Sequence, residues 1–216
     1  MDIIEQQKII NDLVNEGEKD KAVRLLIDWS KQTSFSQVTI DILEPLLVDV
    51  GQRWMQGKVS LAFGYLSGKI AEEFYTISAE SLEYKPKDIK GTVILGNIED
   101  DFHPLGRRMV NIYSKAAGWN IIDLGNDVPA ELFIEEAIKN NADIIAISAM
   151  MFTTAKNISK VRVLLDSNNL SNKLKLAVGG AVFKLRPELV AVVGGDGTAE
   201  TAIGAPELFS KLRIKN

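Results

Sequence analysis

From residue 92 onward the chain alternates short apolar runs with amphipathic segments, and this alternation constrains the fold more than any other feature. The apolar runs have the length of strands and cover 92–98, 120–124, 143–150, 174–178 and 190–193. The segments between them have helical character and cover 105–117, 130–140, 154–165, a short stretch near Pro187, and 202–212. Strands this apolar, separated by helices, belong to parallel sheets covered on both faces. The pattern predicts a doubly wound α/β domain with five parallel strands.

The first 86 residues contain helical patterns only. Apolar residues recur three or four positions apart in four stretches, from Ile3 to Val14, Ala22 to Ile27, about Ser36 to Trp54, and Ser60 to Ile77. Ser36 and Ser60 are the expected N-caps of the last two helices. Pro45 should bend the third helix or mark a late start. Four amphipathic helices with short links predict a small four-helix bundle.

The two patterns meet at 84–90, a segment with Pro86 and four charged residues that has the composition of a linker. We therefore expect a helical cap domain at 1–86. A flavodoxin-like or Rossmann-like sheet domain should follow at 90–216.

Composition narrows the possible functions. The chain has 216 residues, of which 46% are hydrophobic and 25% charged, as in ordinary globular proteins. A net charge of -4 argues against a nucleic-acid-binding surface, and no apolar run approaches the roughly 20 residues that span a bilayer. The acidic start, residues 1–5, is unlike a signal peptide. We expect a cytoplasmic protein that contacts other proteins, with no nucleic acid and no membrane among its partners.

Small and polar residues stand where the predicted strands end. His103 follows the first strand, Ser148 ends the third, Gly179-Gly180 end the fourth and 194–197 end the fifth. In a doubly wound sheet, ligands bind beyond the carboxyl ends of the strands, where the winding reverses. These residues should therefore lie at one edge of the sheet and form a ligand site.

His103 is the only histidine in the sequence, and the chain has no cysteine. The lack of cysteine excludes disulfides and thiolate metal sites. A lone histidine is a poor general base but a good axial metal ligand, and Asp101 can accept its second N–H and raise its basicity. Gly106 lets a bulky group approach the backbone. On position alone, however, a histidine after a strand is more often an ordinary hydrogen-bonded loop residue.

The segment Asp101-Phe102-His103-Pro104-Leu105-Gly106 resembles the D-x-H-x-x-G cobalamin-binding signature of methyltransferase corrinoid proteins and of the cobalamin domain of methionine synthase. Further segments extend the resemblance in the same order. Ser148-Ala149-Met150 stands where the family has S-x-L, Gly179-Gly180 matches its G-G, and Gly194-Gly195-Asp196-Gly197 is similar to its terminal G-x-D-G. The order and spacing of the motifs make the resemblance specific.

The resemblance implies a cobalamin cofactor whose cobalt is ligated from the lower face by His103. The cofactor's dimethylbenzimidazole tail would then be buried in a slot that Gly179 and Gly180 open. Ser148 would hydrogen-bond the tail or, through Asp101, the ligand network.

The nucleotide loop of the cofactor would be flanked by Gly194, Gly195 and Thr198, while Thr153 lies in the Thr-rich turn after S-x-L. No residue is expected to be catalytic. The full set expected to bind the cofactor is Trp54, Leu61, Asp101, Phe102, His103, Pro104, Leu105, Gly106, Ser148, Met150, Thr153, Gly179, Gly180, Gly194, Gly195, Gly197 and Thr198.

The helical region also resembles the cap that precedes the cobalamin domain in this family, through Glu44-Pro45, Val50-Gly51 and 54–57. The resemblance implies that Trp54 and Leu61 shield the reactive upper face of the corrin. Taken without the downstream motifs, Trp54 would be interpreted as part of the bundle core.

With one histidine and no cysteine, the chain cannot build the zinc site that activates thiol acceptors in many corrinoid-dependent methyltransferases. It is also too short to include a barrel domain of about 250 residues. We therefore expect a non-catalytic carrier subunit that shuttles a methyl group on cobalt between partner methyltransferases.

An alternative from a different class is a cobalamin-dependent sensor that regulates a partner. Photosensors of the family place Glu-His ten and eleven residues after the cap tryptophan, where this chain has Gly64 and Tyr65. Two other ligands of the fold fit less well. A phospho-receiver needs Asp and Lys where Ser148 and Gly194 stand, and the acidic run 99–101 would repel a flavin phosphate.

Overall fold

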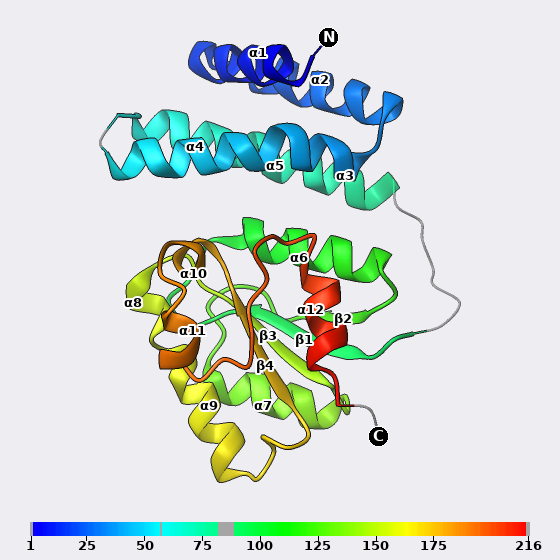
Figure 1. Ribbon diagram of the computed structural model, residues 1–216, viewed down its shortest axis with the longest axis vertical. Coiled ribbons are helices and arrows are strands. Elements are labelled where there is room, and N and C mark those ends of the chain that lie inside the picture. Colours follow the sequence, from blue (N-terminus) through cyan, green and yellow to red (C-terminus); the bar gives the residue numbers. More distant parts are fainter. Residues whose placement is uncertain (1, 57, 82–88, 215–216) are drawn as a thin grey trace. The chain divides into compact units, whose positions relative to one another are not determined.

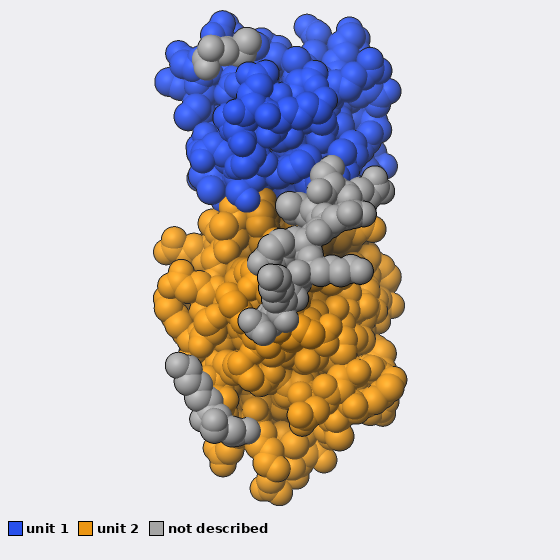
Figure 2. Space-filling model, turned by 90° about the vertical axis from the view of Figure 1, so that its right-hand side faces the viewer, with its two compact units in different colours: residues 1–83 blue, residues 84–216 orange. Residues whose placement is uncertain are grey.

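The computed structural model describes residues 2–56, 58–81 and 89–214. The chain forms two compact units, residues 1–83 and residues 84–216, which Figure 2 distinguishes by colour. Most of the linker expected at 84–90 lies outside the described residues. In the part of the chain that is described, no helix is both long and apolar enough to cross a membrane.

The N-terminal unit is helical, as predicted (Figure 1). Its elements are α1 (Ile3–Glu16), α2 (Lys19–Gln32), α3 (Phe35–Val38), the π-helical turn η1 (Thr39–Leu43), α4 (Glu44–Met55) and α5 (Leu61–Ser81). The apolar stripes face one another, so that Ile10, Leu26, Ile70 and Phe74 are fully buried. Ser60 caps α5 as expected, because its Oγ accepts a hydrogen bond of 3.1 Å from the N–H of Phe63.

The third predicted helix is interrupted on the N-terminal side of Pro45. Proline has no N–H to bond to the carbonyl of Asp41, and that oxygen instead accepts a 2.6 Å hydrogen bond from Nε2 of Gln7. The π-helical turn η1 lies directly before α4, whose second residue is Pro45. The expected N-cap at Ser36 is wrong, since Ser34 holds this position and accepts from the N–H of Gln37 at 3.0 Å.

The second unit contains a parallel sheet whose strand order is β2-β1-β3-β4. The strands are β1 (Thr92–Asn97), β2 (Asn120–Asp123), β3 (Ile144–Ser148) and β4 (Lys175–Gly179). The helices are α6 (Pro104–Ala116), α7 (Ala130–Lys139), α8 (Phe152–Ala155), α9 (Ile158–Ser167), α10 (Ala181–Leu185), α11 (Leu189–Val192) and α12 (Ala205–Leu212). The chain winds from β1 to one side and then from β3 to the other, so the winding reverses between β1 and β3.

Helices cover both faces of this sheet, as its apolar strands predict (Figure 1). On one face, α7 and α9 pack over a core that includes Ile94, Ile145 and Phe133. On the other face, α6 and α12 pack over Val93 and Ile144, and the rings of Trp119 and Phe209 meet edge to face at 5.7 Å.

The expected fifth strand at 190–193 is wrong, because α11 occupies most of it. Leu189 and Val193 are buried while Val192 is 66% exposed, which is the burial pattern of a helix. A short apolar run fits a strand or a helix, and periodicity alone cannot separate the two. After α11 the chain returns to the sheet edge and makes one parallel bridge, Ala177 to Gly197, so the described sheet has four strands.

Candidate functional site

The motif residues of β1, β3 and β4 lie side by side at the carboxyl edge of the sheet. Asn97 is paired with Ser148, and Ser148 is paired with Gly179, so the three residues form one row across the strands. His103 follows β1 as the residue before α6, with Pro104 at the first helical position. The predicted convergence on one edge therefore holds for His103, Ser148 and Gly179.

The imidazole of His103 lies against the carboxylate of Asp101. Nδ1 of His103 is 3.3 Å from Oδ1 of Asp101, and the same oxygen accepts the backbone N–H of His103 at 3.0 Å. Asp101 is fully buried, whereas the His103 side chain is 49% exposed. With Nδ1 turned toward the protein, the opposite ring nitrogen, Nε2, remains available to an external ligand.

Asp101 is held by donors from three other residues. Nδ2 of Asn97 donates to Oδ1 at 2.9 Å, while the N–H of Met150 and the hydroxyl of Thr154 donate to Oδ2 at 2.7 and 3.0 Å. Burial raises the pKa of Asp101, but the hydrogen bonds from Met150, His103, Asn97 and Thr154 outweigh it and lower the pKa from its usual 3.8. The side chain beneath His103 is therefore a fixed negative charge.

Sequence reasoning missed several members of this network. Thr154, rather than the expected Ser148, supplies the hydroxyl that binds Asp101. Asn97 also accepts a 2.9 Å hydrogen bond from Nε of Arg107, whose guanidinium is paired with Asp123. The available signal was the polar residue Asn97 directly after the apolar run of the strand.

Two glycines border space that the protein leaves open. A Cβ added to Gly179 would meet no atom within 4 Å, and one added to Gly106 would meet only Oγ of Ser148, at 3.9 Å. Gly180 has a different reason to be glycine. Its φ is 111° and ψ 171°, and a Cβ there would overlap the backbone carbonyl of Ala149.

The glycines of the later motif are packed against protein. A Cβ on Gly194 would approach Cγ of Arg162 at 2.5 Å, and one on Gly195 would approach the Val178 methyl groups at 2.9 and 3.1 Å. Arg162 clamps this segment, because its Nε donates to the carbonyl of Gly194 at 2.7 Å and its Nη2 to Asp196 at 2.8 Å. A Cβ on Gly197 would be 3.0 Å from Leu208. Protein side chains thus fill the space beside these glycines.

Large apolar side chains are exposed on the loops of the carboxyl edge. Phe102 is 62% exposed, and Met150 is 47% exposed. The neighbouring Phe152 lies within cation–π distance of Lys156 and Arg186, at 4.4 and 4.6 Å. The remaining expected residues have varied exposure: Pro104 and Leu105 are half-buried, whereas Thr153 and Thr198 are exposed.

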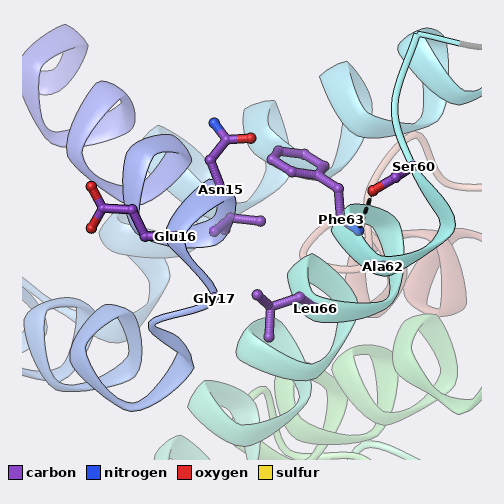
Figure 3. A pocket seen from close by; sticks show the side chains of 8 residues that line it. Asn15, Glu16, Gly17, Ser60, Ala62, Phe63 and Leu66 are labelled. Atoms are coloured by element: carbon purple, nitrogen blue, oxygen red, sulfur yellow. Dashed lines mark hydrogen bonds between the residues drawn. The ribbon is translucent and has the colours of Figure 1, made fainter.

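In the helical unit, Trp54 lies in α4 and Leu61 begins α5, but their side chains are outside the described part of the structure. A separate hollow of about 260 Å³ lies in this unit between the end of α1 and the start of α5 (Figure 3). Its lining residues are Val14, Asn15, Glu16, Gly17, Ser60, Ala62, Phe63 and Leu66. Among the predicted site residues whose side chains the structure describes, none lines it.

The chemistry of the edge fits a flat cofactor that brings its metal with it. Among the described residues, no group of three or more His, Cys, Asp or Glu side chains could hold a metal ion. His103 offers one nitrogen, Gly106 and Gly179 leave space, and Phe102 and Met150 offer apolar surface. Fold and site thus define a doubly wound α/β protein with a candidate ligand site at the carboxyl edge of its sheet.

Comparison with known proteins identifies the family. The sequence models of two families, each described as a B12 binding domain, match residues 91–207 and 7–74. A corrinoid protein of Desulfitobacterium hafniense strain Y51 is 32% identical over 166 residues, which are 76% of each chain. This chain belongs to the B12-binding family of corrinoid proteins, and its cofactor is a corrinoid.

Solved structures agree on the fold. The monomethylamine corrinoid protein of Methanosarcina barkeri matches with a TM-score of 0.84 at 23% identity, over 96% of this chain and 98% of that one. A chain of the methanol:cobalamin methyltransferase complex of the same organism matches with a TM-score of 0.53 at 26% identity, over 96% and 79% of the two chains.

Proposed function

We propose that this protein carries a methyl group on the cobalt of its corrinoid between partner methyltransferases. The observation that carries the proposal is His103, whose Nδ1 lies against the buried carboxylate of Asp101 while Nε2 is left for the metal. The relatives support it, since they are named as corrinoid proteins and one matching structure is a methyltransferase complex. When bound, the corrinoid supplies a cobalt centre that accepts a methyl group and gives it up again.

Each edge residue has a distinct role in this proposal. His103 would hold the cobalt, and the fixed charge of Asp101 would make its imidazole a stronger donor to the metal. Ser148, Gly106 and Gly179 would hold the nucleotide tail of the corrinoid, because they border space that the protein leaves open. The exposed side chains of Phe102 and Met150 give the macrocycle an apolar support, as do the half-buried Pro104 and Leu105.

The later motif has a supporting role in the proposal. Arg162 fixes Gly194 and Asp196, and the bridge between Gly197 and Ala177 brings the chain along β4 toward its carboxyl end. This path carries Thr198 toward the edge that also holds Gly179 and Gly180. Thr198, together with Thr153 after β3, would hold the nucleotide loop.

We propose that the helical unit forms a four-helix cap over the upper face of the corrin. Trp54 and Leu61 shield that face until a partner reaches it. The chain has one histidine and no cysteine, so activation of the methyl donor and acceptor falls to the partner methyltransferases. A Trp54→Ala protein should let the reduced cofactor oxidise faster than in the parent. Equal oxidation rates in the two proteins would show that Trp54 does not shield the cofactor.

The test of ligation uses the reconstituted full-length protein. In the Co(II) state, nitrogen hyperfine structure in the EPR spectrum should change when histidine is labelled with nitrogen-15, and the label should have no effect on the spectrum of His103→Ala. A spectrum that ignores the label would show that the protein supplies no histidine ligand.

A second experiment separates the carrier from the sensor alternative. The reduced holoprotein should be slow toward methyl donors alone and should become methylated in the dark when its cognate methyltransferase is added. If it instead binds adenosylcobalamin stably, changes its gel-filtration volume on illumination, and is methylated by no copurifying methyltransferase, the carrier function is wrong.

A further inference from the structure

Behind the proposed ligand, a chain of polar side chains continues into the sheet. Asn97, the last residue of β1, is fully buried. Its Nδ2 donates to Oδ1 of Asp101 at 2.9 Å and to the backbone carbonyl of His103 at 3.1 Å. The amide group of Asn97 therefore fixes both the carboxylate of Asp101 and the backbone of His103.

Arg107 fixes the orientation of that amide. Arg107 is 6% exposed, and its Nε donates to Oδ1 of Asn97 at 2.9 Å. A guanidinium can only donate, whereas a carboxylate and a carbonyl can only accept. The oxygen of the Asn97 amide must therefore face Arg107, and its NH2 group must face Asp101 and His103. The neighbours at both ends of the amide require the same orientation, so it is determined without ambiguity.

Arg107 is itself anchored at the end of the neighbouring strand. Its guanidinium is paired with Asp123, the last residue of β2, and its Nη2 donates to Oδ1 of Asn126 at 3.2 Å. Asn111, one turn further along α6, donates to the second oxygen of Asp123 at 2.9 Å. The position of the amide thus depends on the carboxyl end of β2 as well as on β1.

We infer that Asn97, oriented by Arg107, is a positioning residue that holds His103 at the height and rotation required for ligation of the corrinoid cobalt. The inference rests on the proposed function, since it takes His103 as the axial ligand. A metal ligand must be held within about 0.5 Å and 10–20° of its productive geometry by groups that are themselves fixed. Asn97 meets this requirement because it is buried and both ends of its amide are bonded.

The decisive variant is Asn97→Asp, which keeps the shape of the side chain and an oxygen acceptor for Arg107 but removes the two NH2 donor bonds. Asn97→Ala removes the whole group. Arg107→Lys keeps the charge near Asp123 but loses the fork that reaches Asn97 at the same time. Arg213→Lys is the control, since Arg213 bonds to Asp143 and Lys90 at the opposite end of the strands.

All four variants and the parent would be reconstituted with hydroxocobalamin, reduced to Co(II) at mildly alkaline pH, and examined by EPR with nitrogen-15 histidine. The readout is the ratio of histidine-bound to histidine-free cobalt, and urea unfolding of each apoprotein reports its stability. We expect this ratio to fall about 10 to 100-fold in Asn97→Asp and Asn97→Ala. The fall should be smaller in Arg107→Lys and absent in Arg213→Lys.

A role in packing alone predicts a different result, in which Asn97→Asp keeps the parental ratio and only Asn97→Ala loses it; that result overturns the inference. If Asn97→Asp does not fold, a parental ratio in Arg107→Lys together with Asn97→Ala overturns it as well. A parent protein that lacks the histidine signal would instead refute the proposed ligation by His103, and the inference with it. The two failures are therefore distinguishable.

Discussion

The glycines of the α/β unit fall into two groups that differ in what lies beside them. Gly106 and Gly179 face space that the protein leaves open, whereas Gly194 and Gly195 face the side chains of Arg162 and Val178. The same residue type thus stands in two physical settings, beside open space in one group and against packed protein in the other. Substitutions should separate the groups, because an added methyl group costs folding free energy only where protein already fills the space.

The largest effect is expected at Gly180, the extreme case of filled space. Its φ of 111° and ψ of 171° lie in a region that glycine alone adopts readily, and a Cβ would overlap the carbonyl oxygen of Ala149. Gly180→Ala should lower the free energy of unfolding by about 3 kcal/mol or more. Urea unfolding of the apoprotein measures this. A loss under about 1 kcal/mol would show that the turn relaxes easily.

The next largest loss of stability is expected at Asp101, where hydrogen bonds rather than packed side chains occupy the surroundings. In Asp101→Asn, the new NH2 group must face donors, either Met150 and Thr154 on one side or Asn97 and His103 on the other. One buried donor left unpaired costs about 1–3 kcal/mol. In the holoprotein the variant should also release His103 from cobalt more easily, with a shifted reduction midpoint.

At low pH the difference in unfolding free energy between the parent and Asp101→Asn should become smaller. The folded state lowers the pKa of Asp101, so ionised Asp101 stabilises the fold above its usual pKa of 3.8, and this contribution is lost as the pH falls through the lower, folded value. The gap in unfolding free energy between the parent and Asp101→Asn should therefore narrow below pH 3.8. A gap that stays constant with pH would show that ionisation of Asp101 does not contribute.

A smaller loss is expected at Gly195, in the group packed against protein. A Cβ would press on the methyl groups of Val178 at 2.9 and 3.1 Å and on the carbonyl of Val190 at 3.2 Å. Gly195→Ala should cost about 1 kcal/mol of unfolding free energy through overpacking. This loss of unfolding free energy should exceed any loss of corrinoid binding free energy in the same variant. A larger loss in binding than in stability would show that Gly195 belongs with the glycines that face open space.

The smallest change in stability, with the opposite sign, is expected at Gly106 within α6. Alanine is the better helix former by about 0.5–1 kcal/mol, and its Cβ would meet only Ser148, at 3.9 Å. Gly106→Ala should therefore stabilise the apoprotein slightly while weakening corrinoid binding. If the added methyl group costs about 1.4 kcal/mol of binding free energy, the affinity falls about tenfold. Absorbance titration with hydroxocobalamin measures the affinity. Unchanged affinity would place the cofactor away from Gly106.

The sequence predicts the four strands of the sheet more accurately than the segment that follows them. Strands β1 to β4 stand within a few residues of their predicted positions, because a buried parallel strand is a continuous apolar run bounded by polar residues. The run at 190–193 has the same composition, but most of it lies in α11, where Leu189 is buried and Val190 packs against the core while Val192 is exposed. Nothing local distinguishes the two outcomes, and the packing of the neighbouring segments decides between them.

The site shows the same limit. The contact between Asp101 and His103 follows from a spacing of two residues and was predictable. The bond from Thr154 to Asp101 joins residues 53 positions apart, and it depends on the pairing of β1 with β3. The pairing of Arg107 with Asp123 likewise depends on how α6 packs on β2. Such partners are set by the assembled sheet, so the motif spacing alone does not reveal them.

Most members of the hydrogen-bond network around His103 are close together in the sequence, which matters for protein engineering. The residues Asn97, Asp101, His103, Arg107 and Asn111 all lie in one continuous stretch, from the end of β1 into α6. The anchors from elsewhere are the side-chain oxygens of Asp123 and Asn126, and the donors of Met150 and Thr154. To transplant the stretch into another doubly wound scaffold, a designer would need to add an acid and an amide at the end of one neighbouring strand and a hydroxyl after the other.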